Sequence, residues 1–452
     1  MPRRLLPLPL LLLLLLLLAG SPPAAATPPA ATTVYRHAAL IDGTGAPVRR
    51  DMAVIVRGER IVAVLPDRGL TRRHLSGAAV VTLAGRYLLP GLIDSHKHIA
   101  TPPDRPRALA VLRRDLYGGV TAMRDMADDL REVTVLARAA RQSEIAAPDI
   151  YYAALVAGPS FFGDPRTRAA AQGLEPGQAP WMQAVAPGSD IAAIVARAKG
   201  TGATALKIYA NLDGATVAAL TREAHRQGLR VWAHGMVFPA TPAQVAAAGP
   251  DVMSHVCYLA YQAMDRRPDS YQNRFPVDAR LFAEGDNAAM ARLFATMRRR
   301  GIILDATDYV YPAAERAERR AGKTPRCTLD LALKLTRQAW RSGVALSAGT
   351  DAEAPRESPW PALFEEMALL GRSGMTPLQV IQAATLTGAE TIGQAREMGS
   401  IRPGKLANLV VLARNPLDSL ANLRSVVMIV KRGRPYPRGD FRPIGKEEME
   451  DD

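Results

Sequence analysis

Cysteine, aromatic residues and long apolar runs are scarce in this 452-residue chain, and each shortage excludes a class of protein. Two cysteines, Cys257 and Cys327, cannot form the framework of a small disulfide-stabilised scaffold. We expect two free thiols, with a single bridge as the alternative in an oxidising compartment. Aromatic residues make up 5% of the chain and do not alternate with the basic residues, which are scattered. The net charge of +14 therefore indicates a basic solvated surface, not a nucleic-acid partner.

The longest apolar run, residues 5–19, follows two arginines and precedes three alanines at positions 24–26. It is shorter than the roughly 20 residues that a membrane-spanning helix needs, and no cysteine follows it to receive a lipid. Residues 1–26 are therefore predicted to be a cleaved signal peptide. We expect an exported protein, periplasmic or secreted, that has no stable membrane anchor after cleavage.

Apolar strand-like runs alternate with amphipathic helix-like runs through the middle of the chain, which is typical of parallel strand–helix–strand units. Eight strand-like runs occur, at residues 88–98, 120–126, 149–158, 203–210, 230–236, 251–259, 302–311 and 345–352. Helix-like runs between them include residues 107–116, 191–199, 216–227, 288–300 and 329–342. This alternation predicts an α/β fold with a (β/α)8 TIM-like barrel over residues 89–398, whose chemistry lies at the carboxyl ends of the strands.

The segments on either side of the barrel have a different pattern. Residues 33–88 and 399–438 contain short alternating runs rich in Val, Ile and Gly, which favour small antiparallel sheets. Because these segments bracket the barrel, we predict one small β-sandwich domain built from both chain ends. Residues 376–392 are predicted to form a helix that joins barrel and β domain, and residues 439–452 a disordered acidic tail.

Histidines are few, and four of the seven fall on predicted barrel strands. His96 and His98 end the first strand as His-x-His, and the strand period of two puts both imidazoles on one face. A His-x-His alone is weak evidence. However, His234 ends the fifth run, His255 lies on the sixth and Asp351 closes the eighth. Converging imidazoles and a carboxylate are the ligands that a divalent transition metal prefers.

Lys207 lies in the apolar run Ala205-Leu206-Lys207-Ile208-Tyr209, where a charged amine is costly unless it is paired or neutralised. A desolvated amine reacts with carbon dioxide, and the resulting carbamate can bridge two cations. The alternative is a lysine whose ammonium extends to the barrel rim. The other three histidines, His37, His74 and His225, are interpreted as structural because they lie in the β domain or at a helix end.

The order His-x-His, strand-borne Lys, His, His, Asp resembles the amidohydrolase superfamily, in particular its imidazolonepropionase-like and prolidase-like branch. Leu89-Pro90-Gly91-Leu92-Ile93-Asp94 is similar to the family's entry into the first barrel strand, and residues 399–412 are similar to its return to the β domain. The resemblance implies that His96, His98 and Asp351 bind one metal. It also implies that His234 and His255 bind a second, and that carboxylated Lys207 bridges the two.

Three positions depart from the family pattern. Asn408 stands where an Asp is usual, Ser254 precedes His255 where a Glu is common, and Gly235 follows His234 where relatives often repeat His-x-His. The six ligand positions are intact. The changes at Ser254 and Gly235 lie beside ligands, so they concern substrate choice and the support of the ligands and not the metal centre itself.

The ligand residues predict a divalent-metal site, and the resemblance implies a metal-dependent hydrolase of amide-type C–N bonds. Two divalent cations that share a bridging water would lower the pKa of that water and supply a hydroxide for attack on the carbonyl. Asp351 would then pass the proton to the leaving nitrogen. Zinc is the first expectation, and cobalt, manganese or iron fit the same shell. A mononuclear deaminase or cyclic-amide hydrolase is the nearest alternative, and a catalytically silent barrel that acts as a binding protein is a second.

A small molecule is the expected substrate, and a dipeptide or an N-acyl amino acid is favoured. The sequence is also compatible with a homo-oligomer. Arginines near the strand ends could bind a substrate carboxylate, and tyrosines that follow strand ends could wall a pocket. The candidates are Arg124, Arg166, Arg168, Tyr209, Tyr258, Tyr261, Tyr309 and Tyr311. Residues 261–287 and 312–328 are long enough to cover the mouth of the barrel as lids.

Overall fold

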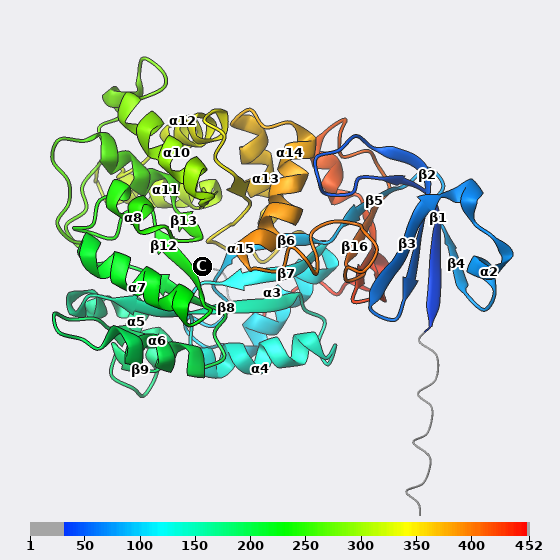
Figure 1. Cartoon of the computed structure of the whole chain (residues 1–452), viewed down its shortest axis with the longest axis horizontal. Coiled ribbons are helices and arrows are strands. Elements are labelled where there is room, and N and C mark those ends of the chain that lie inside the picture. The colour runs from blue at the N-terminus through cyan, green and yellow to red at the C-terminus, as the bar shows by residue number, and fades with distance from the viewer. Residues whose placement is uncertain (1–30, 450–452) are drawn as a thin grey trace, which may run out of the picture. The chain divides into compact units, whose positions relative to one another are not determined.

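Eight short parallel strands form a ring in the computed structural model, which describes residues 31–449 (Figure 1). The strands are β6 (Leu92–Lys97), β7 (Val120–Asp125), β8 (Asp149–Ala157), β11 (Ala205–Ile208), β12 (Arg230–His234), β13 (Val252–Ser254), β14 (Ile303–Asp305) and β15 (Leu346–Ser347). Each pairs in parallel with the next. Between β15 and β6, Ser95 N donates to Ala348 O over 2.8 Å, which nearly closes the ring. The predicted barrel is therefore confirmed.

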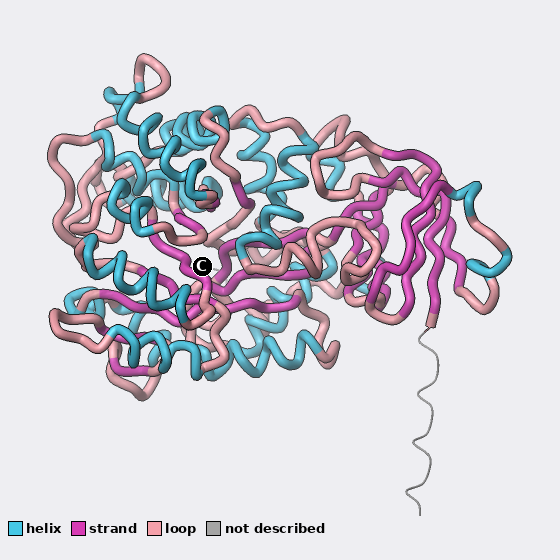
Figure 2. Tube along the Cα trace, viewed as in Figure 1, coloured by secondary structure: helices cyan, strands magenta, loops and turns pink. Residues whose placement is uncertain are grey.

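Helices surround the strands on the outside, as the cyan tubes around the magenta strands show (Figure 2). They include α3 (Arg105–Tyr117), α4 (Leu130–Arg141), α6 (Ile191–Gly200), α7 (Gly214–Arg226), α8 (Pro242–Ala248), α10 (Ala288–Arg300), α12 (Leu329–Arg341) and α13 (Leu363–Arg372). Side-chain caps fix where several of them begin. Asp104, Asp190 and Asp213 each accept a hydrogen bond from a backbone N–H of the first turn.

The inside of the barrel is filled with apolar side chains away from its mouth. Ile93, Ala122, Trp232 and Val252 form one buried cluster there. The same cluster also contains Ala389 and Ile392, from the connection between barrel and β domain. That connection is the predicted helical segment, observed as α14 (Pro377–Gln382), a π-helical turn (Ala383–Thr387) and α15 (Gly388–Thr391). The barrel is a packed core, so ligands are limited to its mouth.

A second sheet contains strands from both ends of the chain. Its order is β18-β17-β16-β5-β1-β2-β3, with β4 paired to β1. The strands are β1 (Thr32–Leu40), β2 (Arg49–Arg57), β3 (Arg60–Pro66), β4 (Ala79–Thr82), β5 (Tyr87–Pro90), β16 (Leu409–Leu412), β17 (Val426–Lys431) and β18 (Arg434–Pro437). β16 pairs with β5, so the C-terminal strands extend a sheet begun by the N-terminal ones.

A buried ion pair joins this sheet to the barrel. Lys431 at the end of β17 lies 2.9 Å from the Asp149 carboxylate at the start of β8, and both side chains are almost fully buried. Arg432 binds the same carboxylate over 2.9 Å. Asn408, where the family usually has an Asp, accepts a hydrogen bond from Arg432 N over 2.8 Å. The substituted position therefore supports this junction and lies away from the barrel mouth.

The prediction of a disordered acidic tail is wrong for residues 439–449. Ile444 and Met449 are buried in a cluster with Ala110 and Val111 of α3. Glu448 forms a 2.8 Å ion pair with Arg113 of the same helix. The two apolar side chains give this acidic segment enough buried surface to pack on the barrel.

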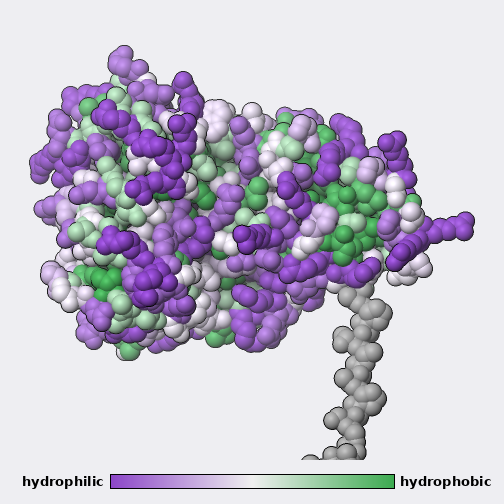
Figure 3. Space-filling model, in the orientation of Figure 1, coloured by the Kyte–Doolittle hydropathy of each residue, from purple (hydrophilic) through white to green (hydrophobic). Residues whose placement is uncertain are grey.

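Most side chains on the face viewed in Figure 3 are hydrophilic, and apolar ones gather over the small β domain. Among the described residues, no helix has both the length and the apolar character that a membrane crossing needs. The predicted signal peptide, residues 1–26, lies outside the described residues.

Candidate active site

His96 and His98 point into the barrel mouth from the carboxyl end of β6, as the alternation of a strand predicts. The Nε2 atoms of His96 and His98 lie 3.3 Å and 3.5 Å from the same Asp351 oxygen. The other ring nitrogen of each is held by a carboxylate, His96 by Asp305 and His98 by Asp128, both over 2.7 Å. These contacts orient both rings with Nε2 toward the mouth.

Asp351 and His255 complete one side of the site from strained backbone positions. Their φ angles are +50° and +72°, which non-glycine residues rarely adopt. Asp351 N donates to His96 O over 3.0 Å, which contributes to this conformation. The His255 Nδ1 atom lies 2.9 Å from the Thr307 hydroxyl and 3.8 Å from the Asp351 carboxylate. Ligand atoms of His96, His255 and Asp351 lie within 4.8 Å of one another.

Lys207 and His234 face the same space from β11 and β12. The Lys207 ammonium is buried, donates to Met126 O over 3.2 Å and lies 4.9 Å from the centre of the Tyr209 ring. The His234 ring packs 4.8 Å from the His255 ring and 3.9 Å from the Tyr209 ring. The structure therefore brings together all six residues that the sequence selected, namely His96, His98, Lys207, His234, His255 and Asp351. We call them the barrel-mouth cluster.

The charge state of the barrel-mouth cluster suits cation binding. Burial lowers the pKa of His96 and His234 well below the usual histidine value, and lowers that of His255 to about 4. Burial raises the pKa of Asp351, but nearby histidines outweigh it and hold that pKa below its usual value. Neutral imidazoles and an ionised carboxylate are the forms that bind metals.

Two of these imidazoles also carry buried nitrogens that lack a protein hydrogen-bond partner. Within residues 31–449, neither ring nitrogen of His234 has such a partner, and Nε2 of His96 has none either. A buried polar atom without a partner is costly, so these nitrogens fit a bound cation. Burial lowers the pKa of Lys207 to about 8, which raises its fraction of reactive free amine at neutral pH.

Arg124 does not reach the substrate space, which corrects its prediction as a substrate contact. Its side chain is fully buried behind the cluster, where Nη2 lies 2.9 Å from Asp305 Oδ2 and Nε donates to Ser95 O. The guanidinium stacks on the Trp232 ring, 4.4 Å from the ring centre. It is therefore a counter-ion for the carboxylate that orients His96.

Asp305 is the supporting residue that the sequence reasoning missed. It ends β14 with a fully buried side chain and accepts hydrogen bonds from Ser254 and Arg124 beside His96. Burial raises the pKa of Asp305. The signal was present, because a carboxylate in Ile302-Ile303-Leu304-Asp305 is as anomalous as the lysine in β11. Ser254, where the family often has a Glu, donates to this carboxylate over 2.9 Å.

A cavity of about 490 Å³ opens above the barrel-mouth cluster. Tyr209 and Tyr258 line it, as predicted, and so do Tyr261 and Tyr311. Its apolar walls include Leu155, Phe161, Met182, Val277 and Val310. The two segments expected to cover the mouth, 261–287 and 312–328, both contribute residues to its wall.

Tyr309 does not line this cavity and faces a separate hollow with Pro312 and Glu365, which corrects its prediction as a substrate contact. Tyr309 lies in a 3-10 turn (Asp308–Val310) and Tyr311 begins helix α11 (Tyr311–Arg320), and side chains two residues apart on helical turns point to different sides. Arg168 is also absent from the lining, whereas Arg166 is part of it.

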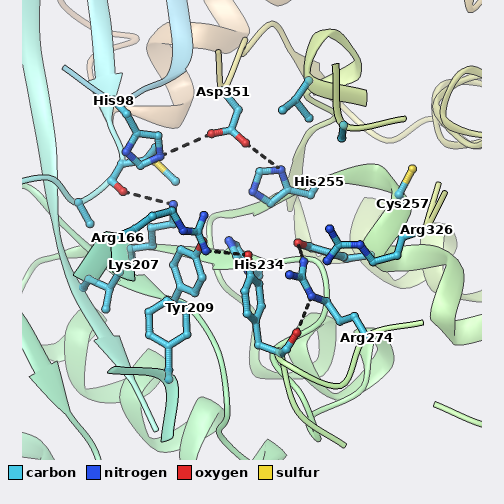
Figure 4. Close-up of a pocket in the computed structure, with 18 of the residues that line it drawn as sticks. His98, Arg166, Lys207, Tyr209, His234, His255, Cys257, Arg274, Arg326 and Asp351 are labelled. Atoms are coloured by element: carbon cyan, nitrogen blue, oxygen red, sulfur yellow. Dashed lines mark hydrogen bonds and ion pairs between the residues drawn. The ribbon is translucent and has the colours of Figure 1, made fainter. Parts of the chain in front are cut away.

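Three guanidinium groups line the cavity, from Arg166, Arg274 and Arg326 (Figure 4). Arg166 is paired with Asp164 at 2.8 Å, and Arg326 with Glu318. Arg274 lies 3.5 Å above the centre of the Tyr271 ring and donates to the Tyr258 hydroxyl and, over 2.6 Å, to Tyr271 O. Burial raises the pKa of the Tyr271 phenol, but Arg274 and Arg166 outweigh it and lower that pKa to about 8.

The expectation of two free thiols is wrong, because Cys257 and Cys327 form a disulfide in the cavity wall. The cysteines lie 70 residues apart in sequence, and the fold of the second covering segment brings Cys327 against the end of β13. The alternative of a single bridge is the one that the structure contains.

A family model described as Amidohydrolase family matches residues 87–435, a span that contains the whole barrel-mouth cluster. The chain belongs to the amidohydrolase family. Among curated proteins, this amidohydrolase is 32% identical to ochratoxinase of Aspergillus niger over 122 residues, 26% of this chain and 25% of that enzyme. It is 41% identical to imidazolonepropionase of Geobacillus kaustophilus (strain HTA426) over 71 residues, 16% of each chain. The aligned segments thus span a quarter or less of these relatives.

Solved structures share the fold over nearly the whole chain. A. niger ochratoxinase superposes with a TM-score of 0.72 at 20% identity, covering 93% of this amidohydrolase and 99% of that chain. A Xaa-Pro dipeptidase with bound methionine in its active site gives 0.68 at 20% identity, covering 90% and 100%. The family model therefore confirms the resemblance to amidohydrolases, and these structures show that the fold is shared over nearly the whole chain.

Proposed function

We propose that this amidohydrolase cleaves an amide-type C–N bond close to a free carboxylate, as in a dipeptide or an N-acyl amino acid. Arg274 carries the substrate part of the proposal. It is a half-buried guanidinium in the cavity wall, and within residues 31–449 no carboxylate pairs with it. A partly desolvated cation without a counter-ion is costly, and a substrate carboxylate would neutralise it. The dipeptidase and the ochratoxinase, whose folds are similar, give the proposal further support.

Two divalent metal ions, with zinc as the first choice, fit the barrel-mouth cluster. One ion would be held by His96, His98 and Asp351. The other would be held by His234 and His255, and a carboxylated Lys207 would bind both ions. When bound, the ions would activate the attacking water and polarise the amide carbonyl. A mononuclear enzyme would leave Lys207 uncarboxylated, and metal counting separates the two cases.

Asp351 is the proposed proton carrier. Its carboxylate lies 3.3 Å and 3.5 Å from two imidazole nitrogens, which keep it ionised and therefore able to accept the proton of the attacking water. It would then deliver this proton to the leaving nitrogen, so that the C–N bond breaks to give an acid and an amine. The strained backbone at Asp351 fixes the carboxylate over the centre of the site.

The cavity wall contains two chemically different groups of residues. Arg274, Tyr258 and Tyr271 supply a cation and hydroxyl groups, which would bind the carboxylate of the leaving amino acid. Leu155, Phe161 and Met182 supply apolar surface, which would hold the acyl group. The covering segments limit the cavity to small molecules.

The test compares one N-acyl amino acid with its C-terminal amide in the wild type and in Arg274→Met. Loss of a charged hydrogen-bond partner should raise KM for the acid about 10- to 100-fold and leave the amide nearly unchanged. Arg280→Met is the matched control, because Arg280 lies in the same segment with a side chain that is 90% exposed. Equal hydrolysis of acid and amide by the wild type would contradict carboxylate recognition and leave the metal chemistry untouched.

We also propose that the protein is exported to the periplasm or secreted. The Cys257–Cys327 disulfide supports this proposal, because disulfides persist in oxidising compartments and are rare in the reducing cytosol. Cell fractionation, combined with thiol alkylation before and after reduction, tests it. A cytosolic protein with two alkylatable thiols would contradict it.

A further inference from the structure

The disulfide occupies a position between the barrel-mouth cluster and the cavity cover. Cys257 lies two residues after His255, in the short helix α9 (Val256–Leu259). Cys327 is the last residue but one of the covering segment 312–328 and directly follows Arg326. Both cysteines are buried and line the cavity. The bridge therefore fastens the cover to a strand end that carries a residue of the cluster.

The two covering segments meet beside this bridge. The Arg326 carbonyl accepts a hydrogen bond from Val277 N over 3.0 Å, so segment 261–287 is attached to the residue next to Cys327. The Arg326 amide in turn donates to Glu318 over 2.8 Å, within segment 312–328. Arg274 stands three residues before Val277. One covalent bond thus anchors both segments.

The two segments differ in how much regular structure they contain, because segment 312–328 includes most of helix α11 (Tyr311–Arg320) and segment 261–287 is largely irregular. Residues 264–278 contain no helix or strand, so their backbone lacks the repeated hydrogen bonds that make an element rigid. Arg274 donates to the Tyr258 hydroxyl of α9 and to Tyr271 O, and Tyr271 is tied to neighbouring segments by Asn211 (2.8 Å) and Arg166 (3.0 Å). The position of the guanidinium therefore depends on these contacts on one side of Arg274, and on the other side on the Val277–Arg326 link that the disulfide anchors.

We infer that the Cys257–Cys327 disulfide is a positioning element for carboxylate recognition, which holds the Arg274 and Arg326 wall at a fixed place over the barrel-mouth cluster. This inference rests on the proposed function, because it concerns the same cavity. Opening the bridge leaves the strand ends and the cluster in place and frees the cover. Substrate carboxylate is then bound by a guanidinium that must first be ordered, which weakens binding more than it slows the bond-breaking step.

Reduction opens the bridge in a balanced step. A dithiol such as dithiothreitol attacks one sulfur, the Sγ–Sγ bond breaks, and two electrons and two protons convert Cys257 and Cys327 to thiols. The dithiol becomes its cyclic disulfide. The chain contains no other cysteine. The double variant Cys257→Ser/Cys327→Ser is therefore the control for the dithiol, because any effect of the dithiol on this variant cannot come from opening the bridge.

The experiment measures kcat and KM for an N-acyl amino acid and its amide, using oxidised wild type, reduced wild type, reoxidised wild type and the double serine variant. Hydrogen exchange of residues 261–287 and 312–328 is followed in the same samples, together with metal content. On reduction we expect faster exchange in both segments, a rise of about tenfold in KM for the acid, and a change of less than about threefold in kcat. The amide should respond by less than about twofold, and reoxidation should restore KM.

Unchanged exchange and unchanged KM after reduction would overturn the inference. Equal losses for acid and amide, or loss of metal, would also overturn it, because they would indicate a general structural role. If the serine variant does not fold, reduction and reoxidation of folded wild type give the same comparison. If oxidised wild type does not distinguish acid from amide, the proposed function fails, and exchange alone decides whether the bridge anchors the cover.

Discussion

Replacing Arg124 by methionine removes the cation from a buried carboxylate and keeps most of the side-chain length. Arg124 and Asp305 form a 2.9 Å ion pair in which neither side chain is exposed, and Asp305 in turn orients His96. In Arg124→Met the carboxylate stays buried with the Ser254 hydroxyl and the His96 ring as its remaining polar partners. The variant therefore tests a structural role against the substrate contact that strand position alone predicts.

Removing one member of a buried ion pair costs about 3–5 kcal/mol of folding free energy. At about 1.4 kcal/mol per tenfold, this is a factor of roughly 100 to 5,000 in the unfolding equilibrium. Urea unfolding followed by near-ultraviolet circular dichroism measures the loss. Arg124→Lys keeps the charge and should lose less, about 1–2 kcal/mol, because it gives up the planar stack on Trp232. Adding Asp305→Asn to Arg124→Met should recover part of the loss, since both charges are then gone.

The contrary result is specific. If Arg124 binds the substrate carboxylate, Arg124→Met keeps the wild-type urea midpoint and raises KM only for substrates with a free carboxylate. That combination would refute the reasoning. A lower midpoint, together with equal losses of kcat/KM for an N-acyl amino acid and its amide, would agree with an arginine that acts on His96 through Asp305.

Four further outcomes are expected. Lys207→Ala should lose much of the second of two bound metals, and unchanged metal content by plasma mass spectrometry would remove the bridging role. Asp351→Asn should keep its circular dichroism spectrum and lose at least about a hundredfold in kcat, because an amide cannot carry the proton; near-native turnover would transfer that duty elsewhere. Burial lowers the pKa of Lys207 to about 8, and the free amine is the form that reacts with carbon dioxide. At fixed dissolved carbon dioxide, the rate at which metal-free enzyme is reactivated should therefore fall by about tenfold for each pH unit below pH 8 and level off above pH 8. A reactivation rate that does not change with pH would contradict this. Truncation after residue 438 exposes the surface under Ile444 and Met449, so stability should fall by about 2–4 kcal/mol with metal content intact; an unchanged urea midpoint would mean that the tail contributes nothing.

The barrel and the barrel-mouth cluster could be predicted from sequence because both depend on local rules. Apolar runs of strand length, separated by capped amphipathic helices, determine the parallel ring, and the strand period puts His96 and His98 on one face. Lys207 was visible as a charge in an apolar run. Asp305 carried the same signal, and applying that rule to every strand would have found it.

The outer part of the site could not be predicted in this way. Arg274 lies in irregular backbone, so which side chain turns inward depends on the Tyr271 ring below it and the Tyr258 hydroxyl beside it. Arg124 follows the strand pattern, but a pattern gives the face and not the depth at which a side chain ends. The pairing of Cys257 with Cys327 depends on how a 70-residue excursion folds back.

The small sheet shared by both chain ends has a consequence for how the protein is made. Arg60 donates a 2.7 Å hydrogen bond to the Gly404 carbonyl, 344 residues later in the sequence. Strand β5 likewise pairs with β16, which lies near the other end of the chain. Contacts between such distant residues form slowly, because a long loop must close before they stabilise anything. β5 therefore lacks its β16 partner until almost the whole chain has been synthesised. During that interval its unpaired edge is open to other strands, so we expect the newly made protein to depend on chaperones until its last strands arrive.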